Sequence, residues 1–362
     1  MRYLRTKHAL LELAYHTGLT HLLHSKWPAG RNDGTILIYH SIGDSIENPL
    51  IPSQMRVSPS RFAAQMAYLA RRCHVMPLLE LGNMIRTGSP LPFRAVALTF
   101  DDGFKDNVTQ ALPVLSRLGL TATFFVVSEW IGAQRLSWLH RLYHMVHMQP
   151  AAEVLADFIG ECRQLDPPIL VDPSAVRSHE PLGALRYLLL NELSAADADA
   201  MVDRVWRRRV QMSARDEAGM AARLYMSWED LDRLRQSGMD VGGHTMTHSK
   251  LPRLSRPAVE HEITQSHKVL EQRLGMPIAT FSYPFGWPDS FDEACRQALG
   301  DAGMQVACAL VGGSGRPGRD PLALGRLPME DMSGAEFALE MTGLPGGLRA
   351  ARGGLRAVLS RA

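Results

Sequence analysis

Arg94-Ala-Val-Ala-Leu-Thr-Phe-Asp-Asp-Gly103 is an apolar run that ends in two adjacent carboxylates and a glycine. Residues 94–100 predict a β-strand. In a βα barrel, the C-terminal ends of the strands are where catalytic groups gather. Because adjacent residues at a strand's end point in different directions, Asp102 can bind a metal ion while Asp101 faces a substrate. A turn with solvated carboxylates is the alternative for this motif taken alone.

The chain around this run alternates between short apolar runs and capped amphipathic segments, a pattern typical of βα units around a parallel sheet. The other predicted strands cover residues 35–39, 121–127, 239–243, 278–282, 304–311 and 322–327. Predicted helices follow Ser58 with Pro59, Ser227, Ser255, and Ser333 with Glu336 as a capping box. About seven strands with intervening helices predict a closed or nearly closed barrel of the α/β class, formed by residues 34–130 and 227–343.

Residues 131–226 do not follow this alternation of apolar runs and amphipathic segments. They contain helical stretches at 138–148 and 182–210, a proline-containing link near 166–173, and little strand character. We predict a helical insertion at one mouth of the barrel. Such an insertion can shape substrate access, or it can be a packing subdomain without substrate contact, and the sequence favours neither.

Both ends of the chain are basic. Residues 1–33 form a basic amphipathic segment in which Glu12 is the one acid before residue 33, and the tail 344–362 contains four arginines and no acid. Peripheral attachment to an anionic membrane fits this pattern, and ordinary docking helices or a frayed tail fit it better. Glu12 and several histidines interrupt the apolar run of a signal peptide. We therefore expect a cytoplasmic protein, with the inner membrane face as a second option.

The composition is that of an ordinary globular protein, with 46% hydrophobic and 21% charged residues among 362 and a formal net charge of +2. A net charge this small gives little electrostatic attraction to nucleic acid, so we expect no nucleic-acid partner. No stretch approaches the roughly 18 to 20 apolar residues that span a bilayer. The cysteines show no CxxC spacing and are interpreted as buried thiols in a reducing compartment: Cys73, Cys162, Cys295 and Cys308.

A second motif, Gly242-Gly-His-Thr-Met-Thr-His248, also follows a predicted strand. Its two histidines can converge on one cation if the chain turns helically after His244. Two neutral imidazoles and one carboxylate make an open catalytic metal site. Because the motif lacks the glutamate of His-Glu-x-x-His, the base must come from elsewhere, and Asp101 can supply it. A histidine pair on a surface helix is the alternative, which the neighbouring carboxylate motif makes less attractive.

These motifs resemble those of the NodB-type polysaccharide deacetylases, carbohydrate esterase family four. Thr99-Phe-Asp-Asp-Gly103 and His244-Thr-Met-Thr-His248 match the first two motifs, and Phe281-Ser-Tyr-Pro-Phe-Gly286 looks like the third. The resemblance implies a distorted (β/α)7 barrel of the polysaccharide deacetylase type with an inserted helical subdomain. It also implies a hydrolase that removes N-acetyl groups from amino sugars of a glycan or glycan precursor, with metal-activated water and an aspartate base.

The resemblance further implies a role for each matching residue. Asp102, His244 and His248 would bind one divalent ion, with zinc expected, and Asp101 would be the base. The backbone N–H of Tyr283 would help to stabilise the oxyanion. An N-acetylated carbohydrate is the expected partner, and the sequence predicts no oligomeric state.

The chain departs from the family in its general acid and in one arginine. No histidine follows His267. His40 is the candidate acid, and around it the chain is similar to the poly-N-acetylglucosamine deacetylase branch. A strand-end histidine beside a carboxylate can stay protonated near neutral pH; a satisfied core histidine is the alternative. The arginine that often precedes the third motif is absent, and Arg326 on a late strand can orient Asp101 instead. Histidines of the insertion are interpreted as surface or packing residues: His140, His144 and His147.

Two other activities remain open. An O-acetyl esterase on a carbohydrate would use the same metal site but would not need to protonate an amine leaving group. A non-catalytic module that binds metal and glycan would tolerate a change of charge at Asp101.

Overall fold

The computed structural model describes residues 34–44, 50–165, 168, 181–311 and 319–341. The predicted basic segments 1–33 and 344–362 lie outside these residues, as does most of the link near 166–173. No helix of the described chain is long and apolar enough to cross a membrane.

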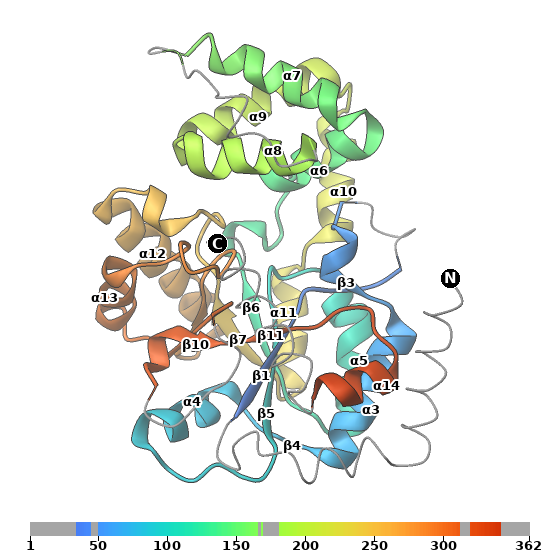
Figure 1. Ribbon diagram of the computed structural model, residues 1–362, viewed down its shortest axis with the longest axis vertical. Helices are drawn as coiled ribbons and strands as arrows, with labels where there is room; N and C mark the ends of the chain where they lie inside the picture. Colours follow the sequence, from blue (N-terminus) through green and yellow to red (C-terminus); the bar gives the residue numbers. More distant parts are fainter. Residues whose placement is uncertain (1–33, 45–49, 166–167, 169–180, 312–318, 342–362) are drawn as a thin grey trace, which may run out of the picture.

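A parallel sheet forms the centre of the fold (Figure 1). Its strands run in the order β10-β9-β8-β7-β6-β5-β1-β11, and the short β4 also pairs with β5. Their bounds are β1 Thr35–Tyr39, β4 His74–Val75, β5 Ala95–Phe100, β6 Thr123–Val126, β7 Asp240–Gly243, β8 Thr280–Ser282, β9 Val306–Ala309, β10 Leu324–Gly325 and β11 Leu327–Pro328. All six residues of β5 are buried, as expected for a central strand covered on both faces.

The sheet closes on itself almost completely through one short segment. The expected last strand, 322–327, is in fact two strands separated by Arg326. The N–H of Arg326 donates to the carbonyl oxygen of Ala309 on β9, and the N–H of Met329 donates to that of Ile38 on β1, both at 3.0 Å. The segment therefore changes partner at Arg326, and it bridges the two ends of the sheet. This confirms the expected α/β fold with a nearly closed parallel barrel.

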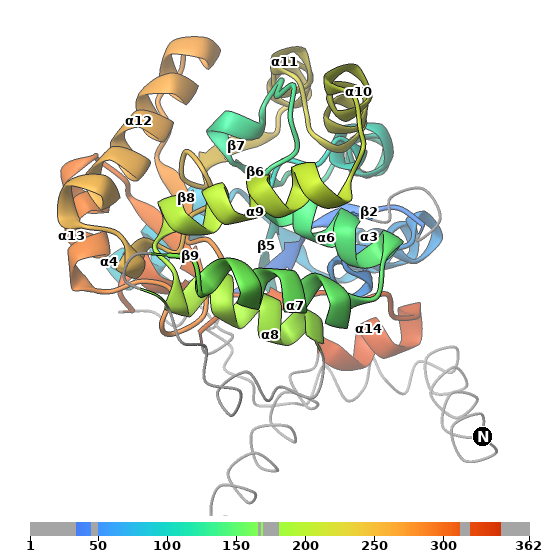
Figure 2. The ribbon, with the colours of Figure 1, turned by 90° about the horizontal axis from the view of Figure 1, so that it is seen from above.

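Helices surround the barrel (Figures 1 and 2). They are α3 Pro59–Arg72, α4 Leu78–Thr87, α5 Leu112–Leu118, α11 Trp228–Gln236, α12 Arg256–Leu274, α13 Glu293–Asp301 and α14 Gly334–Glu340. The capping box at Ser333 and Glu336 is confirmed. Ser58 precedes α3 as expected, but its hydroxyl donates to Asp331 at 2.7 Å rather than capping its own helix. A separate pair of short strands, β2 Ser41–Ile42 and β3 Arg56–Val57, lies beside the barrel.

Between β6 and β7 the chain is helical, and we call residues 131–226 the helical insertion. It contains α6 Trp138–Met148, α7 Ala151–Cys162, α8 Pro181–Tyr187, the π-helical turn η4 Leu188–Glu192, α9 Ala195–Arg209 and α10 Ala214–Leu224. The helix expected over 182–210 is interrupted because Ser194 caps a new helix by accepting from the N–H of Asp197. These helices pack around Phe158, Leu185 and Val202. The division of the chain at 131 and 226 stays a prediction.

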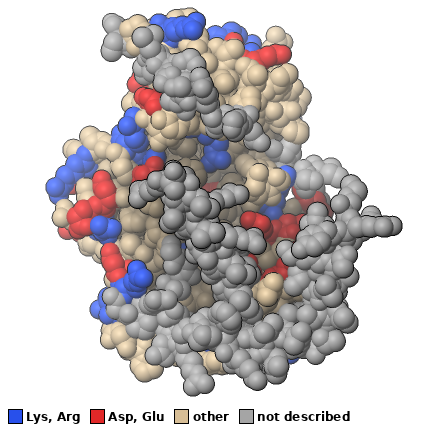
Figure 3. Space-filling model, viewed as in Figure 1, with Lys and Arg blue, Asp and Glu red and all other residues tan. Residues whose placement is uncertain are grey.

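The helical insertion stands at one end of the barrel (Figures 1 and 2). An isolated antiparallel bridge joins Tyr225 of the insertion to Phe104, which follows β5. On the face shown in Figure 3, the described basic and acidic side chains are interspersed over the insertion and over α12 and α13. The insertion therefore lies close to the carboxyl end of β5, where the predicted site begins.

Candidate active site

Asp101 and Asp102 lie where β5 ends and the chain turns. The N–H of Asp101 still donates to the carbonyl oxygen of Tyr39 on β1, at 3.0 Å. The next two residues are left-handed, with φ angles of 76° for Asp102 and 77° for Gly103. A Cβ atom at Gly103 would come within 3.2 Å of Val126, so the left-handed φ and the close approach of Val126 both favour glycine here. The turn gives the two neighbouring carboxylates different partners.

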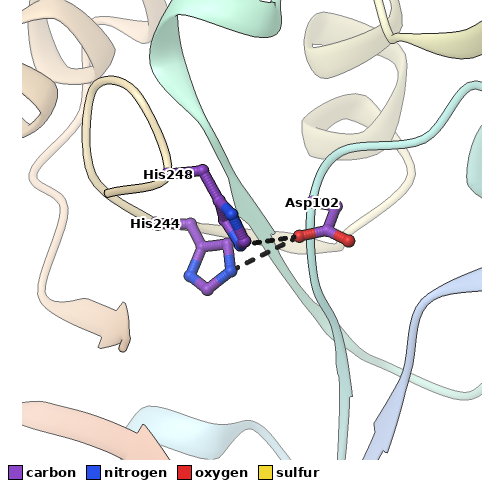
Figure 4. Close-up of side chains that lie close together, drawn as sticks. All are labelled: Asp102, His244 and His248. Atoms are coloured by element: carbon purple, nitrogen blue, oxygen red, sulfur yellow. Dashed lines mark ion pairs between the residues drawn. The ribbon is translucent and has the colours of Figure 1, made fainter. Parts of the chain in front are cut away.

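Asp102 faces the two histidines of the second motif (Figure 4). Its Oδ1 lies 3.5 Å from Nε2 of His244 and 3.4 Å from Nε2 of His248. All three side chains are buried, and their ligand atoms lie within 4.8 Å of one another. The two distances are too long for good direct hydrogen bonds. Donors about 2.0–2.1 Å from a tetrahedral zinc ion are about 3.3 Å apart. The three residues therefore fit one divalent ion.

The imidazole of His244 is oriented by the next strand. Its Nδ1 lies 2.7 Å from the carbonyl oxygen of Ser282. A carbonyl oxygen can only accept, so Nδ1 donates to it and Nε2 is the ring nitrogen that faces Asp102. Burial would lower the pKa of His244, but the charges of Asp101 and Asp102 outweigh it and raise that pKa. Burial lowers the pKa of His248 against the opposing charge of Asp102, which favours the neutral ring that binds metals.

The segment that carries the two histidines is a loop, which corrects the expected helical turn. Thr245 and His248 are left-handed, with φ angles of 67° and 64°. The carboxylate of Glu262 on α12 accepts from the N–H groups of Met246 and Thr247 at 2.9 and 3.0 Å. It also accepts from the Thr247 hydroxyl at 2.7 Å. These bonds hold the segment in its loop conformation, so the histidines converge through a loop.

Left-handed backbone is concentrated at this site. Four of the five non-glycine residues with positive φ in the described chain belong to it: Asp102, Thr245, His248 and Phe285. Such conformations cost free energy and persist where the surrounding structure enforces them. Two aromatic rings enclose His248 and help to hold it in this conformation. The centroid of the His248 ring lies 5.2 Å from that of Trp130 and 4.8 Å from that of Phe285.

Arg326 binds Asp101 from the far end of the sequence. Its Nη1 and Nη2 donate to Oδ1 and Oδ2 of Asp101 at 2.7 and 2.6 Å, a bidentate pair. The hydroxyl of Ser282 donates to Oδ2 at 2.9 Å and accepts from Arg326 at 2.8 Å. Burial would raise the pKa of Asp101, but the charges of Arg326 and His244 outweigh it and lower that pKa. Asp101 is therefore held as a carboxylate whose orientation Arg326 fixes.

His40 follows β1 and lies near the carboxylates. Its backbone carbonyl oxygen accepts from Asn107 at 2.7 Å, and its ring is half-buried. Burial lowers the pKa of His40, and the negative charges of Asp102 and Asp101 oppose this only in part. The expectation that this ring stays protonated near neutral pH is therefore wrong, and the neutral form is favoured.

Tyr283 does not have a free backbone N–H, contrary to the expectation. That group donates to the carbonyl oxygen of Cys308 on β9 at 3.0 Å, because residue 283 continues the β8–β9 ladder. The next left-handed residue, Phe285, has a backbone N–H that meets no acceptor in the described chain. Its ring contacts His248, so this N–H is the better candidate donor to an oxyanion.

The insertion contributes aromatic and histidine side chains beside the site. His140 is 2% exposed, and burial lowers its pKa to about 3. The Tyr225 hydroxyl lies 2.8 Å from His140 Nδ1, and the His140 ring lies 5.0 Å from that of Trp130. The packing interpretation holds for this ring, yet only Trp130 separates it from His248. Sequence reasoning missed Trp130 and Glu262, since no motif marks them, and it gave no role to Ser282, although this residue lies within the third motif.

The rim of the barrel also contacts the insertion. Nζ of Lys250 donates to Asn191 of η4 at 2.9 Å and to Asp289 at 2.6 Å. The guanidinium of Arg186 on α8 lies 5.9 Å from the centre of the Trp287 ring. Lys250 and Trp287 lie just beyond the second and third motifs, so the insertion touches both loops.

Comparison with known proteins agrees with this geometry. The Polysaccharide deacetylase family matches residues 88–158 and 199–307, which include Asp101, Asp102 and both histidines. His40 and Arg326 lie outside the matched residues. The chain is 33% identical over 98 residues to YxkH of Bacillus subtilis, a protein of the polysaccharide deacetylase class, covering 27% of this chain and 33% of that one.

A second relative is the poly-β-1,6-N-acetyl-D-glucosamine N-deacetylase of Escherichia coli, 28% identical over 111 residues, or 30% of this chain and 16% of that enzyme. The chain thus spans a third or less of these curated relatives. Among solved structures, Streptococcus pyogenes deacetylase PplD has the same fold, with a TM-score of 0.55 at 16% identity over 86% of this chain and 98% of that one. This chain belongs to the polysaccharide deacetylase family.

Proposed function

We propose that the protein is a metal-dependent hydrolase that removes N-acetyl groups from amino sugars of a glycan or glycan precursor. The observation that carries this proposal is the buried cluster of Asp102, His244 and His248 beside a second carboxylate, Asp101, that Arg326 holds in one orientation. One carboxylate faces the cation ligands and the other is free for proton transfer, as amide hydrolysis requires.

Asp102, His244 and His248 would bind the ion, for which we propose zinc because two imidazoles and a carboxylate suit it. When bound, a divalent ion supplies positive charge that acidifies water and polarises the acetamide carbonyl.

Asp101 removes the proton from the attacking water. A carboxylate has about four lone-pair sites, of which Arg326 takes two and the hydroxyl of Ser282 one, so one remains for the water. The pair with Arg326 keeps Asp101 ionised and prevents its rotation. The backbone N–H of Phe285 donates to the oxygen on which negative charge develops.

The bond between the carbonyl carbon and the nitrogen then breaks, and the nitrogen gains a proton. We assign delivery of this proton to His40, which is neutral at rest. His40 accepts the proton that Asp101 took from the attacking water and donates it to the amine. Acetate and a free amino sugar are the products.

The wider setting is part of the same proposal. A cytoplasmic location is supported by the unpaired state of Cys73, Cys162, Cys295 and Cys308, which fits a reducing compartment. The basic segments 1–33 and 344–362 support peripheral attachment to the inner face of the membrane.

Acetate release from matched N-acetylated and O-acetylated hexosamines tests the reaction. We expect release from the N-acetylated sugar, and Asp101→Asn should reduce it by about 10²- to 10⁴-fold while metal content is unchanged. Release from the O-acetylated sugar alone would identify an esterase. Metal and glycan binding with no release, or with Asp101→Asn behaving as wild type, would identify a non-catalytic module.

A further inference from the structure

A cavity of about 770 Å³ lies between the helical insertion and the barrel, within the usual size of ligand pockets. We call it the insertion cavity. Its lining includes Trp130, Thr247, Lys250 and Glu262 from the barrel side and Trp138 and Leu190 from the insertion. The proposed metal ligands do not line it.

The insertion cavity and the active site share a wall. Trp130 lines the cavity, and its ring packs 5.2 Å from the ring of His248. Thr247, which also lines the cavity, directly precedes His248. Glu262 also lines the cavity, and its carboxylate accepts from the N–H of Thr247 at 3.0 Å. A ligand in the cavity would therefore contact Trp130, which packs on His248, and Thr247, which precedes His248 in the chain.

The lining combines apolar surface with balanced polar groups. Leu189, Leu190 and Leu193 supply buried apolar surface, and the indole of Trp138 is half-buried beside them. Two of the cations are neutralised within the protein, Arg141 by Glu217 at 2.7 Å and Lys250 by Asp289 at 2.6 Å. The exposed acidic and basic groups of the lining carry both signs: Glu129, Arg135, Asp199 and Arg253.

This chemistry suits a sugar ring better than other ligands. A pyranose has apolar faces that pack on indole and leucine, and hydroxyls that pair with acids and bases alike. A phosphate backbone would require an excess of free cations, and an acyl tail would leave the charged groups without partners.

We propose that the insertion cavity is a glycan-binding subsite, which holds further sugar residues of the chain whose acetamide group lies at the metal cluster. This inference rests on the proposed deacetylase function and deepens it, since it makes the substrate an oligosaccharide or longer glycan. The helical insertion then shapes substrate selection in addition to packing on the barrel.

The test compares β-1,6-linked N-acetylglucosamine oligomers of one to six units. For the wild type, kcat/KM for acetate release should rise with length. Ala258→Trp, which fills the cavity from α12, should lower kcat/KM for the hexamer by about tenfold, the effect of losing one strong contact, and leave the shortest substrate unchanged. Lys268→Trp is the matched control, because Lys268 is exposed on the same helix and does not line the cavity. Trp138→Phe should show a smaller loss of the same kind.

A rate that does not depend on length, or equal losses for short and long substrates, would overturn the subsite. Direct binding separates this failure from failure of the deacetylase proposal. Calorimetry of Asp101→Asn with the hexamer should show binding that Ala258→Trp weakens and Lys268→Trp does not. If no oligomer releases acetate but this pattern of binding is found, the reaction is wrong and the subsite stands. Absence of hexamer binding to Asp101→Asn would overturn the subsite.

Discussion

The ion pair at the mouth of the barrel differs in burial from the ion pairs that join α7 and α9 of the helical insertion. Arg326 and Asp101 form a bidentate pair whose side chains are 1% and 4% exposed. In the insertion, Arg204 and Arg208 on α9 bind Glu161 on α7 at 2.7 and 2.8 Å, and these arginines are about half exposed. A buried charge that loses its partner is costly, whereas an exposed pair contributes little. The barrel pair therefore fixes one geometry, and the pairs between α7 and α9 only add to packing.

Arg326→Met gives the largest expected effect on stability. It leaves the carboxylate of Asp101 buried without its partner, so the free energy of unfolding should fall by about 3–5 kcal/mol. Urea denaturation measures this loss. The double variant Arg326→Met/Asp101→Asn should recover part of it, because the uncompensated charge is gone. If Arg326→Met is as stable as the wild type, the pair does not fix the barrel mouth.

His40→Ala affects turnover rather than stability. Loss of the group that protonates the amine should reduce kcat by about 10²- to 10³-fold and leave metal content unchanged. His74→Ala is the matched control, since His74 is exposed on β4, away from the site. Full turnover by His40→Ala would remove this residue from the mechanism.

The strands and both motifs of the barrel mouth could be predicted because their signals are local. The apolar run before Asp101 and the short run before His244 each mark a strand and its end. The strand with which a given segment pairs, in contrast, is not determined by the local sequence. The last strand is divided at Arg326 because its first part pairs with β9 and its second part with β1. The N–H of Tyr283 is occupied because of the register between β8 and β9.

The loop between the two histidines shows the same limit. Spacing alone predicts a helical turn from His244 to His248, since residues four apart share a helix face. In the structure, the carboxylate of Glu262 on α12 accepts from the N–H groups of Met246 and Thr247 and holds the segment as a loop. No motif identifies Glu262. The protonation of His40 was mispredicted for a related reason, since burial is a property of the folded chain.

Glu262→Gln should have a smaller effect than loss of the Asp101 pair or of His40. One carboxylate oxygen of Glu262 accepts from both loop N–H groups, and the oxygen of a neutral amide accepts more weakly than that of a carboxylate. The His244–His248 loop therefore loses part of its support, and metal affinity should fall by about tenfold. Competition with a chromogenic chelator measures this affinity independently of turnover. Glu260→Gln controls for lost charge, because Glu260 lies on the same helix and pairs with Arg256 in solvent. Equal affinities of the two variants would mean that Glu262 does not position the loop.

The smallest expected effect is the acid sensitivity of the insertion. The hydrogen bond from Arg209 lowers the pKa of Asp157; burial would raise the pKa of Glu161, but its bonds to Arg204 and Arg208 lower it. Because the native pKa values are lowered, the stabilisation is complete above the pKa of a free carboxyl, about 4. It is lost as pH falls through the native values. Solvent exposure of the arginines limits the loss to about 1 kcal/mol.

Hydrogen exchange in α7 and α9 is the suitable measurement, since it reports the insertion separately from the barrel. The protection factors of these helices should fall below about pH 4, before those of β5 and β6 do. Glu161→Gln should lower the protection factors of α7 and α9 at neutral pH to the values that the wild type has in acid. Glu153→Gln should not, because Glu153 is 64% exposed and 3.8 Å from its arginine. If protection in the barrel strands is lost at the same pH as in α7 and α9, both regions depend on their ion pairs to the same degree. The contrast between them would then be wrong.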